Sequence, residues 1–173
     1  MNPLRSVRAV CFDWGGTLMS EHGGPGDLAM GLWPQVEVID GASEAVAMLH
    51  GKIPLAIATN ASVSTRPLTE LALRRAGLDH HFSDVFCFRE LRCRKDQPQF
   101  WAAVERGLQV PLRHIAMVGD SYEQDALWPR RFGVQGVWFN RVGAPAEDEA
   151  AFPVVSTLSA FSAWVLESLD PSV

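Results

Sequence analysis

Short apolar runs alternate along this chain with segments of helical periodicity, and this alternation constrains the fold more than any other feature. The runs typical of buried strands are residues 7–12, 53–59, 84–88, 115–118, 134–139 and 154–155. The segments with helical spacing are residues 42–49, 64–76, 98–108, 123–131 and 159–169, with a bend or early end expected at Pro129. Strands that alternate with helices form βαβ units, so the sequence predicts one doubly wound α/β domain with a parallel sheet.

Length and composition narrow the class of protein. A chain of 173 residues with 47% hydrophobic and 20% charged residues is typical of one globular domain, here residues 1–173. The formal net charge of −5 disfavours a nucleic-acid partner. No signal-peptide core is evident and no apolar run approaches ~18 residues, so we expect a cytoplasmic protein without a membrane partner. The cysteines form no CxxC pair, which agrees with a reducing compartment.

Polar side chains follow several of the predicted strands at the points where those strands end. They are Asp13 after the first strand, Thr59 and Asn60 at the end of the second, Lys95 beyond the third, and Asp120 with Asp125 beyond the fourth. Ligands of doubly wound sheets bind at the carboxyl ends of the strands. We therefore expect these side chains to converge on one site.

These residue types suit phosphoryl chemistry. Clustered aspartates provide the oxygen ligands that Mg²⁺ prefers. A lysine ammonium and a threonine hydroxyl can neutralise and hydrogen-bond phosphoryl oxygens. An aspartate carboxylate is itself a nucleophile, and an aspartyl-phosphate divides one difficult reaction into two easier steps. In-line phosphoryl transfer needs mainly positioning and charge neutralisation, which this set of residues could supply.

The same residues, taken in order, resemble the motifs of the haloacid dehalogenase-like (HAD) superfamily. Residues 13–18, DWGGTL, match the first motif, DxDGT followed by Leu or Val, except at its third position. Thr59 matches the Thr or Ser that closes the second strand, and Lys95 matches the lysine of the third motif. Residues 119–125, GDSYEQD, match the fourth motif, GDxxxxD. All of these motifs stand at predicted strand ends.

The resemblance implies a fold and a cofactor. The fold is a Rossmann-like three-layer sandwich with strand order 3-2-1-4-5 and no cap or a minimal one, the latter a flap-like loop over about residues 15–38. The implied cofactor is Mg²⁺. Its implied ligands are Asp13, the backbone carbonyl of Gly15 and Asp120.

The resemblance also assigns roles in catalysis. It implies that Asp13 is the nucleophile and that Thr59 and Lys95 bind the phosphoryl group. Asp125 is expected to act through water or by orienting Lys95. The implied substrate-binding residues are Gly16, Thr59, Asn60 and Lys95. The implied reaction is that of a Mg²⁺-dependent phosphatase.

Gly15 departs from the family pattern. Family phosphatases carry a second Asp there, which protonates the leaving group and then activates water, and such help is worth ~10²–10⁴-fold in rate. Glycine cannot transfer a proton, so the resemblance supports phosphoryl capture better than turnover and predicts a low or specialised activity. Glu21 and His22, in the flap-like loop, are candidates to replace the missing group.

Other functions stay open. Phosphonate-cleaving members of the family show a similar DWAGT stretch, but they use a cap lysine, and residues 19–39 contain none. Dehalogenase members also lack the second Asp. A phosphotransferase with a long-lived aspartyl-phosphate and a catalytically weakened protein that binds phospho-ligands are further alternatives. We expect a small phosphorylated substrate or a phosphorylated macromolecule, and a second copy of the chain could cover the site.

Overall fold

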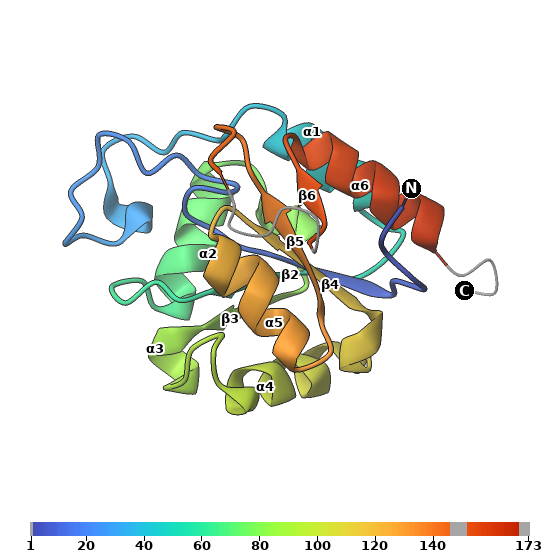
Figure 1. Ribbon diagram of the computed structural model, residues 1–173. Coiled ribbons are helices and arrows are strands. Elements are labelled where there is room, and N and C mark those ends of the chain that lie inside the picture. Colours follow the sequence, from blue (N-terminus) through green and yellow to red (C-terminus); the bar gives the residue numbers. More distant parts are fainter. Residues whose placement is uncertain (1, 146–151, 170–173) are drawn as a thin grey trace.

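The computed structural model describes residues 2–145 and 152–169, and six parallel strands within them form one sheet in the order β3-β2-β1-β4-β5-β6 (Figure 1). The strands are β1 (Ala9–Phe12), β2 (Leu55–Thr59), β3 (Asp84–Cys87), β4 (Ile115–Gly119), β5 (Gln135–Phe139) and β6 (Val154–Val155). This confirms the predicted α/β sandwich, and β6 extends the predicted order at one edge. The prediction of one domain over residues 1–173 includes positions 1, 146–151 and 170–173, which lie outside the described residues.

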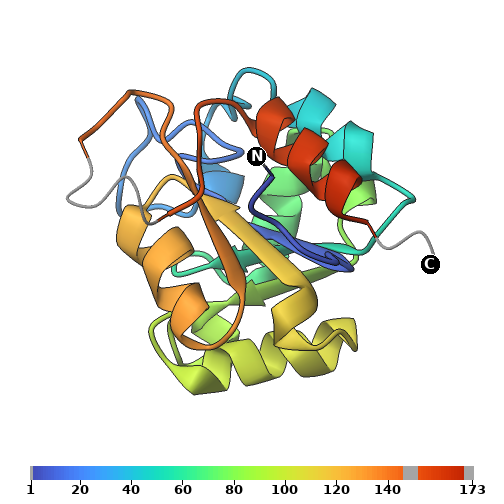
Figure 2. The same ribbon diagram turned by 45° about the vertical axis from the view of Figure 1, so that its right-hand side comes forward.

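Helices cover both faces of this sheet. Helices α1 (Ala42–Leu49), α2 (Arg66–Arg75) and α6 (Leu158–Ser168) pack on one face, and α4 (Pro98–Leu108) packs on the other (Figure 2). The shorter helical elements are η1 (Met30–Leu32), η2 (Asp79–His81), α3 (Phe88–Leu91), η3 (Leu112–His114), η4 (Tyr122–Leu127) and α5 (Trp128–Arg131). No helix in the described ranges is long and apolar enough to cross a bilayer.

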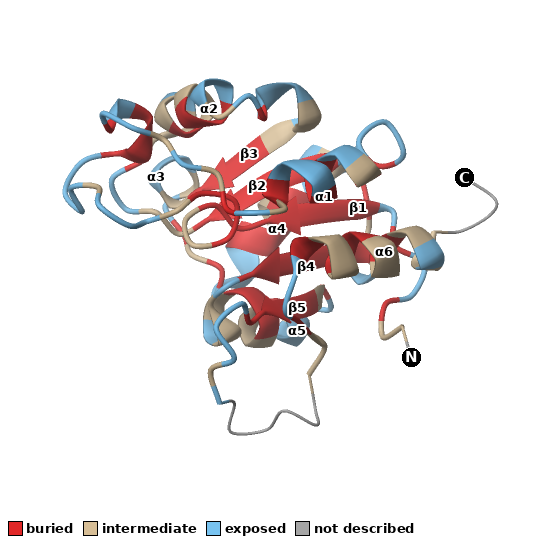
Figure 3. Cartoon of the chain, turned by 90° about the horizontal axis from the view of Figure 1, so that it is seen from above, coloured by how far each residue is buried: buried red, intermediate tan, exposed pale blue. Residues whose placement is uncertain are grey.

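Alternate residues of strands β1 to β4 enter two separate cores. In β1, Val10 and Phe12 pack with α1, α2 and α6, whereas Ala9 and Cys11 pack with α4. This follows from the strand geometry, in which successive side chains point to opposite faces. Both faces are therefore buried, as in other parallel sheets, and Figure 3 shows the strands buried along most of their length.

The segment after β4 differs from a simple helix. Residues 123–131 were predicted to be helical with a bend at Pro129, and the structure divides this region into the π-helical turn η4 and the α-helix α5. Pro129 stands in the first turn of α5, where the missing N–H of proline costs no intrahelical hydrogen bond. The Ser121 hydroxyl caps η4 by accepting from the Gln124 N–H at 3.3 Å.

The segment of residues 15–38, which we call the flap, extends from the carboxyl end of β1 and contains no regular element beyond η1 (Figure 1). Its base is closed where the Ser20 N–H donates to the Glu37 carbonyl at 2.8 Å. Its tip rests on α2, because the Arg75 guanidinium donates to the carbonyls of Gly31 at 2.8 Å and Trp33 at 2.6 Å. The flap is thus held over the strand ends at both its base and its tip.

Candidate active site

A buried lysine joins two carboxylates at the centre of the site. Lys95 Nζ lies 2.7 Å from Asp13 Oδ1 and 2.6 Å from Asp125 Oδ1. The side chain of Lys95 is only 1% exposed, so this ammonium depends on its two partners rather than on water. The Lys95 carbonyl accepts from the Trp101 indole N–H at 2.8 Å, which ties the loop after α3 to α4.

The electrostatics of this trio follow from its burial. Burial alone would lower the pKa of Lys95, but Asp125 and Asp13 more than offset it, so the pKa is raised and the ammonium is charged. Burial raises the pKa of Asp125, and Lys95 together with the Ser121 N–H, which donates at 3.0 Å, opposes that change. The lysine therefore balances the charge of two carboxylates that are largely buried.

Thr17 connects Asp13 to a third carboxylate. Its hydroxyl lies 3.3 Å from Asp13 Oδ2 and 3.4 Å from Asp120 Oδ1, and it accepts from the Asp120 N–H at 3.0 Å. Burial and the nearby charges of Asp13 and Glu21 raise the pKa of Asp120 to about 6. Burial and Asp13 also raise the pKa of Glu21. Negative charge is therefore concentrated here beyond what Lys95 neutralises.

This carboxylate group fits a hard divalent cation. One oxygen each from Asp13, Asp120 and Asp125 lies within 4.8 Å of the others. Carboxylate oxygens are the ligands that Mg²⁺ prefers. Both Asp125 oxygens accept close hydrogen bonds, from Lys95 at 2.6 Å and from the Ser121 N–H at 3.0 Å. Asp13 Oδ2 and Asp120 Oδ1 have only the longer contacts of 3.3 and 3.4 Å with the Thr17 hydroxyl, so they are better able to take a cation.

The backbone beneath Asp120 requires glycine. Gly16 has φ of +77°, a conformation that residues with a side chain rarely adopt. A Cβ at this position would also overlap the Asp120 carboxylate and lie 2.7 Å from its Cγ. The glycine predicted here as a substrate contact thus allows Asp120 to lie against the loop after β1.

A chain of amides lies beside Lys95. Asn60 accepts from the Lys95 N–H at 3.0 Å and donates to Gln124 Oε1 at 2.7 Å. The Thr59 hydroxyl, buried at the end of β2, accepts from the Ala61 N–H at 3.1 Å and still has its own proton to donate. The predicted polar residues of β2 and of the loop after α3 are therefore brought together.

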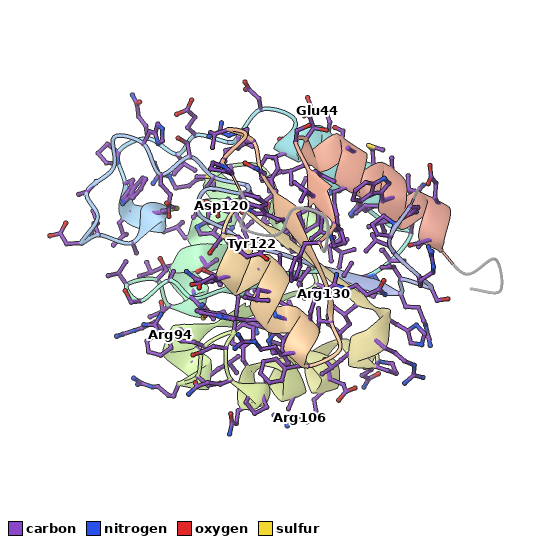
Figure 4. The ribbon with its side chains drawn as sticks, in the orientation of Figure 1. Glu44, Arg94, Arg106, Asp120, Tyr122 and Arg130 are labelled. Atoms are coloured by element: carbon purple, nitrogen blue, oxygen red, sulfur yellow. The ribbon has the colours of Figure 1, made fainter. Side chains whose placement is uncertain are left out.

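A cavity of about 580 Å³ opens over these residues, beneath the flap. The predicted site residues that line it are Asp13, Gly15, Thr59, Asn60, Asp120 and Asp125. Lys95 lies under Asp13 rather than on the wall, and Gly16 lines a neighbouring pocket of about 180 Å³. Asp120 and Arg94, labelled in Figure 4, lie on the side of the molecule from which the flap extends.

Thr17 and Gln124 carried no assigned role in the sequence, and Arg94 was expected only as a surface residue that helps to hold an anionic substrate. Thr17 stands inside the first motif, and its hydroxyl is the link between Asp13 and Asp120. Gln124 holds Asn60, and Arg94 lines the cavity while donating to the Asn60 carbonyl at 3.1 Å. The signal available for Thr17 was its place in the first motif, four residues after Asp13.

Comparison with known proteins identifies the family. Residues 29–133 match the haloacid dehalogenase-like hydrolases, and the chain belongs to that family. The matched region contains Thr59, Lys95, Asp120 and Asp125. A HAD hydrolase of Bacillus subtilis, YfnB, solved bound to magnesium, has the same fold with a TM-score of 0.77 at 17% identity over 93% of this chain and 99% of that chain.

Two curated relatives have different activities. The phosphoserine phosphatase of Thermus thermophilus is 33% identical over 120 residues, which are 69% of this chain and 45% of the relative. The (S)-2-haloacid dehalogenase 2 of a Pseudomonas species is 32% identical over 95 residues, which are 55% of this chain and 40% of the relative. The matched regions thus span less than half the length of these relatives.

Removal of the buried ammonium tests its role in the fold. We expect Lys95→Met to lower the free energy of unfolding by about 3–5 kcal/mol, because it leaves Asp13 and Asp125 buried without their counter-charge. The measurement is urea denaturation without added metal. Lys52→Met is the matched control because Lys52, the other lysine of the chain, is exposed, and a change within about 0.5 kcal/mol is expected there. Equal losses in the two variants would contradict this account.

Proposed function

We propose that this chain is a Mg²⁺-dependent phosphatase that acts through an aspartyl-phosphate on Asp13. The observation that carries the proposal is the Lys95 ammonium held at 2.7 Å from Asp13 Oδ1 in a site with further carboxylates. Such an ammonium fixes the direction of the Asp13 carboxylate, as the attack of a nucleophile requires. The phosphatase relative from Thermus thermophilus supports the same reaction class.

The proposed roles follow from the contacts of each residue. Asp13 attacks phosphorus, while Lys95 and Thr17 hold its carboxylate from two sides. The Thr59 hydroxyl donates to a phosphoryl oxygen, and Asp125 positions Lys95 through the contact at 2.6 Å. Mg²⁺, held by Asp13, Asp120 and the Gly15 carbonyl, would neutralise charge on the phosphoryl oxygens.

The cavity supports a small substrate. A volume of about 580 Å³ is in the range of ordinary small-molecule sites. Its wall combines the apolar side chains of Trp14, Met30 and Trp33 with the guanidinium of Arg94. We therefore favour a small phosphate monoester over a phosphorylated macromolecule, and coverage of the site by a second copy of the chain stays a prediction.

Dehalogenation is the second candidate, because of the relative from Pseudomonas. In that reaction a carboxylate displaces a halide from carbon, a step that needs no divalent cation. The cluster of Asp13, Asp120 and Asp125 favours the phosphatase instead, because so much negative charge suits a site that binds a cation and a phosphoryl group.

A turnover assay tests the proposal directly. We expect release of phosphate from p-nitrophenyl phosphate with Mg²⁺, since a good leaving group needs little acid catalysis, and loss of this release on chelation of the metal. Asp13→Asn should reduce the rate to background, because an amide is not a nucleophile here. Asp40→Asn, which changes an exposed aspartate, is the matched control and should leave the rate unchanged. Mg²⁺-independent halide release from 2-chloropropionate, with no phosphate release, would contradict the proposal.

The cation site has its own test. We expect Gly16→Ala to abolish the rise in melting temperature that Mg²⁺ produces in the wild-type protein, because the added Cβ displaces the Asp120 carboxylate. Gly51→Ala is the control. Gly51 has a similar φ of +74° but no heavy atom near the position of a Cβ, so that variant tests backbone strain alone. A retained Mg²⁺ response in Gly16→Ala would argue against Asp120 as a ligand.

A further inference from the structure

The space beside Gly15 is filled by another residue's carboxyl group. A Cβ on Gly15 would overlap Glu21 Oε1 and would lie 3.0 Å from Glu21 Cδ and 3.1 Å from Met30 Cε. A side chain at position 15 would have to displace the end of the Glu21 side chain. Glycine at position 15 and the carboxyl group of Glu21 are therefore linked by packing, although they lie in different parts of the flap.

Glu21 reaches the proposed reaction centre and His22 does not. Glu21 lines the cavity of about 580 Å³ together with Asp13 and Asp120. His22 is absent from that wall and lines the neighbouring pocket of about 180 Å³. Of the two residues that the sequence suggested as substitutes for the missing acid, only Glu21 lines the cavity that contains the nucleophile.

We infer that Glu21 is the residue that transfers protons in the proposed phosphatase reaction, in place of a side chain at position 15. This inference rests on the proposed function. The observation behind it is that the Glu21 carboxyl group lies where a side chain of residue 15 would begin, in the same cavity as Asp13. Its carboxyl would act as general acid and then as general base, the pair of tasks that the two-step reaction requires.

With Glu21 in this role, the bonds and protons of both reaction steps are accounted for. In the first, Asp13 forms a bond to phosphorus, the bond from phosphorus to the leaving oxygen breaks, and that oxygen takes the proton of the Glu21 carboxyl. In the second, a water oxygen bonds to phosphorus as its proton returns to Glu21. The bond from phosphorus to Asp13 then breaks and releases inorganic phosphate with the free carboxylate.

The test uses the full chain and p-nitrophenyl phosphate with Mg²⁺. We expect Glu21→Gln to release one equivalent of p-nitrophenolate rapidly and then turn over at least about 100-fold more slowly than wild type, because water is no longer activated. The slow variant should carry phosphate on Asp13 in quenched samples. Glu37→Gln, which changes another flap carboxylate that is exposed and outside the cavity, should keep the wild-type rate.

A rescue separates chemistry from structure. In Glu21→Ala the cavity gains room beside Gly15, and adding Gly15→Asp to it should raise turnover at least about 10-fold over Glu21→Ala alone, with loss of the initial burst. Melting temperatures of the variants show whether any of them is simply unfolded. A merely structural role for Glu21 would give no rescue and no burst.

The remaining outcomes distinguish the two proposals. Normal turnover without a burst in Glu21→Gln, or a loss that follows His22→Gln instead, would overturn the role of Glu21 and leave the phosphatase proposal intact. No p-nitrophenolate release and no phosphate on Asp13 in the wild-type protein would overturn the phosphatase proposal, and the role of Glu21 with it.

Discussion

The buried ammonium of Lys95 is the interaction on which the arrangement of this site depends. It lies between carboxylates that two different strands deliver, Asp13 after β1 and Asp125 beyond β4. The register of these neighbouring strands pairs Phe12 with Val118, so the residues that follow them emerge at the same level of the sheet. Lys95 arrives from the far side of β2, after β3, and its backbone is fixed there by Asn60. Without the lysine, the converging strand ends would bring together carboxylates that burial makes costly.

The negative charge of the carboxylates at the site exceeds what one lysine can neutralise. Burial and the charge of Asp13 raise the pKa of both Asp120 and Glu21, and the charge of Glu21 raises that of Asp120 further. A site with this excess is suited to a cation that brings a phosphoryl group with it. The flap adds to this negative charge, because it carries the Glu21 carboxyl into the space beside Gly15. Arg75 of α2 holds the flap in place through the Gly31 carbonyl. The absence of a side chain at position 15 is then part of how the flap packs.

The fold was predictable because its signals are local. Each strand is a short apolar run, and each polar residue at a strand end is visible without knowledge of its partner. Lys95 and Asp13 are 82 residues apart, and their convergence was expected from their places at the carboxyl ends of strands. Their assignment as phosphoryl-binding lysine and nucleophile came from the family resemblance. The position of Glu21 was not predictable, because the flap has no periodicity and its path is set by contacts with α2. The split of residues 123–131 into η4 and α5 was anticipated only as a bend at Pro129.

The central claim is that Asp13 takes up the phosphoryl group. The most direct measurement is peptide mass spectrometry of the wild-type protein, quenched in acid during turnover of p-nitrophenyl phosphate with Mg²⁺. We expect one phosphorylated peptide, with phosphate on Asp13, and none in Asp13→Asn. Turnover without a phosphorylated Asp13, or phosphate on another residue, would contradict it.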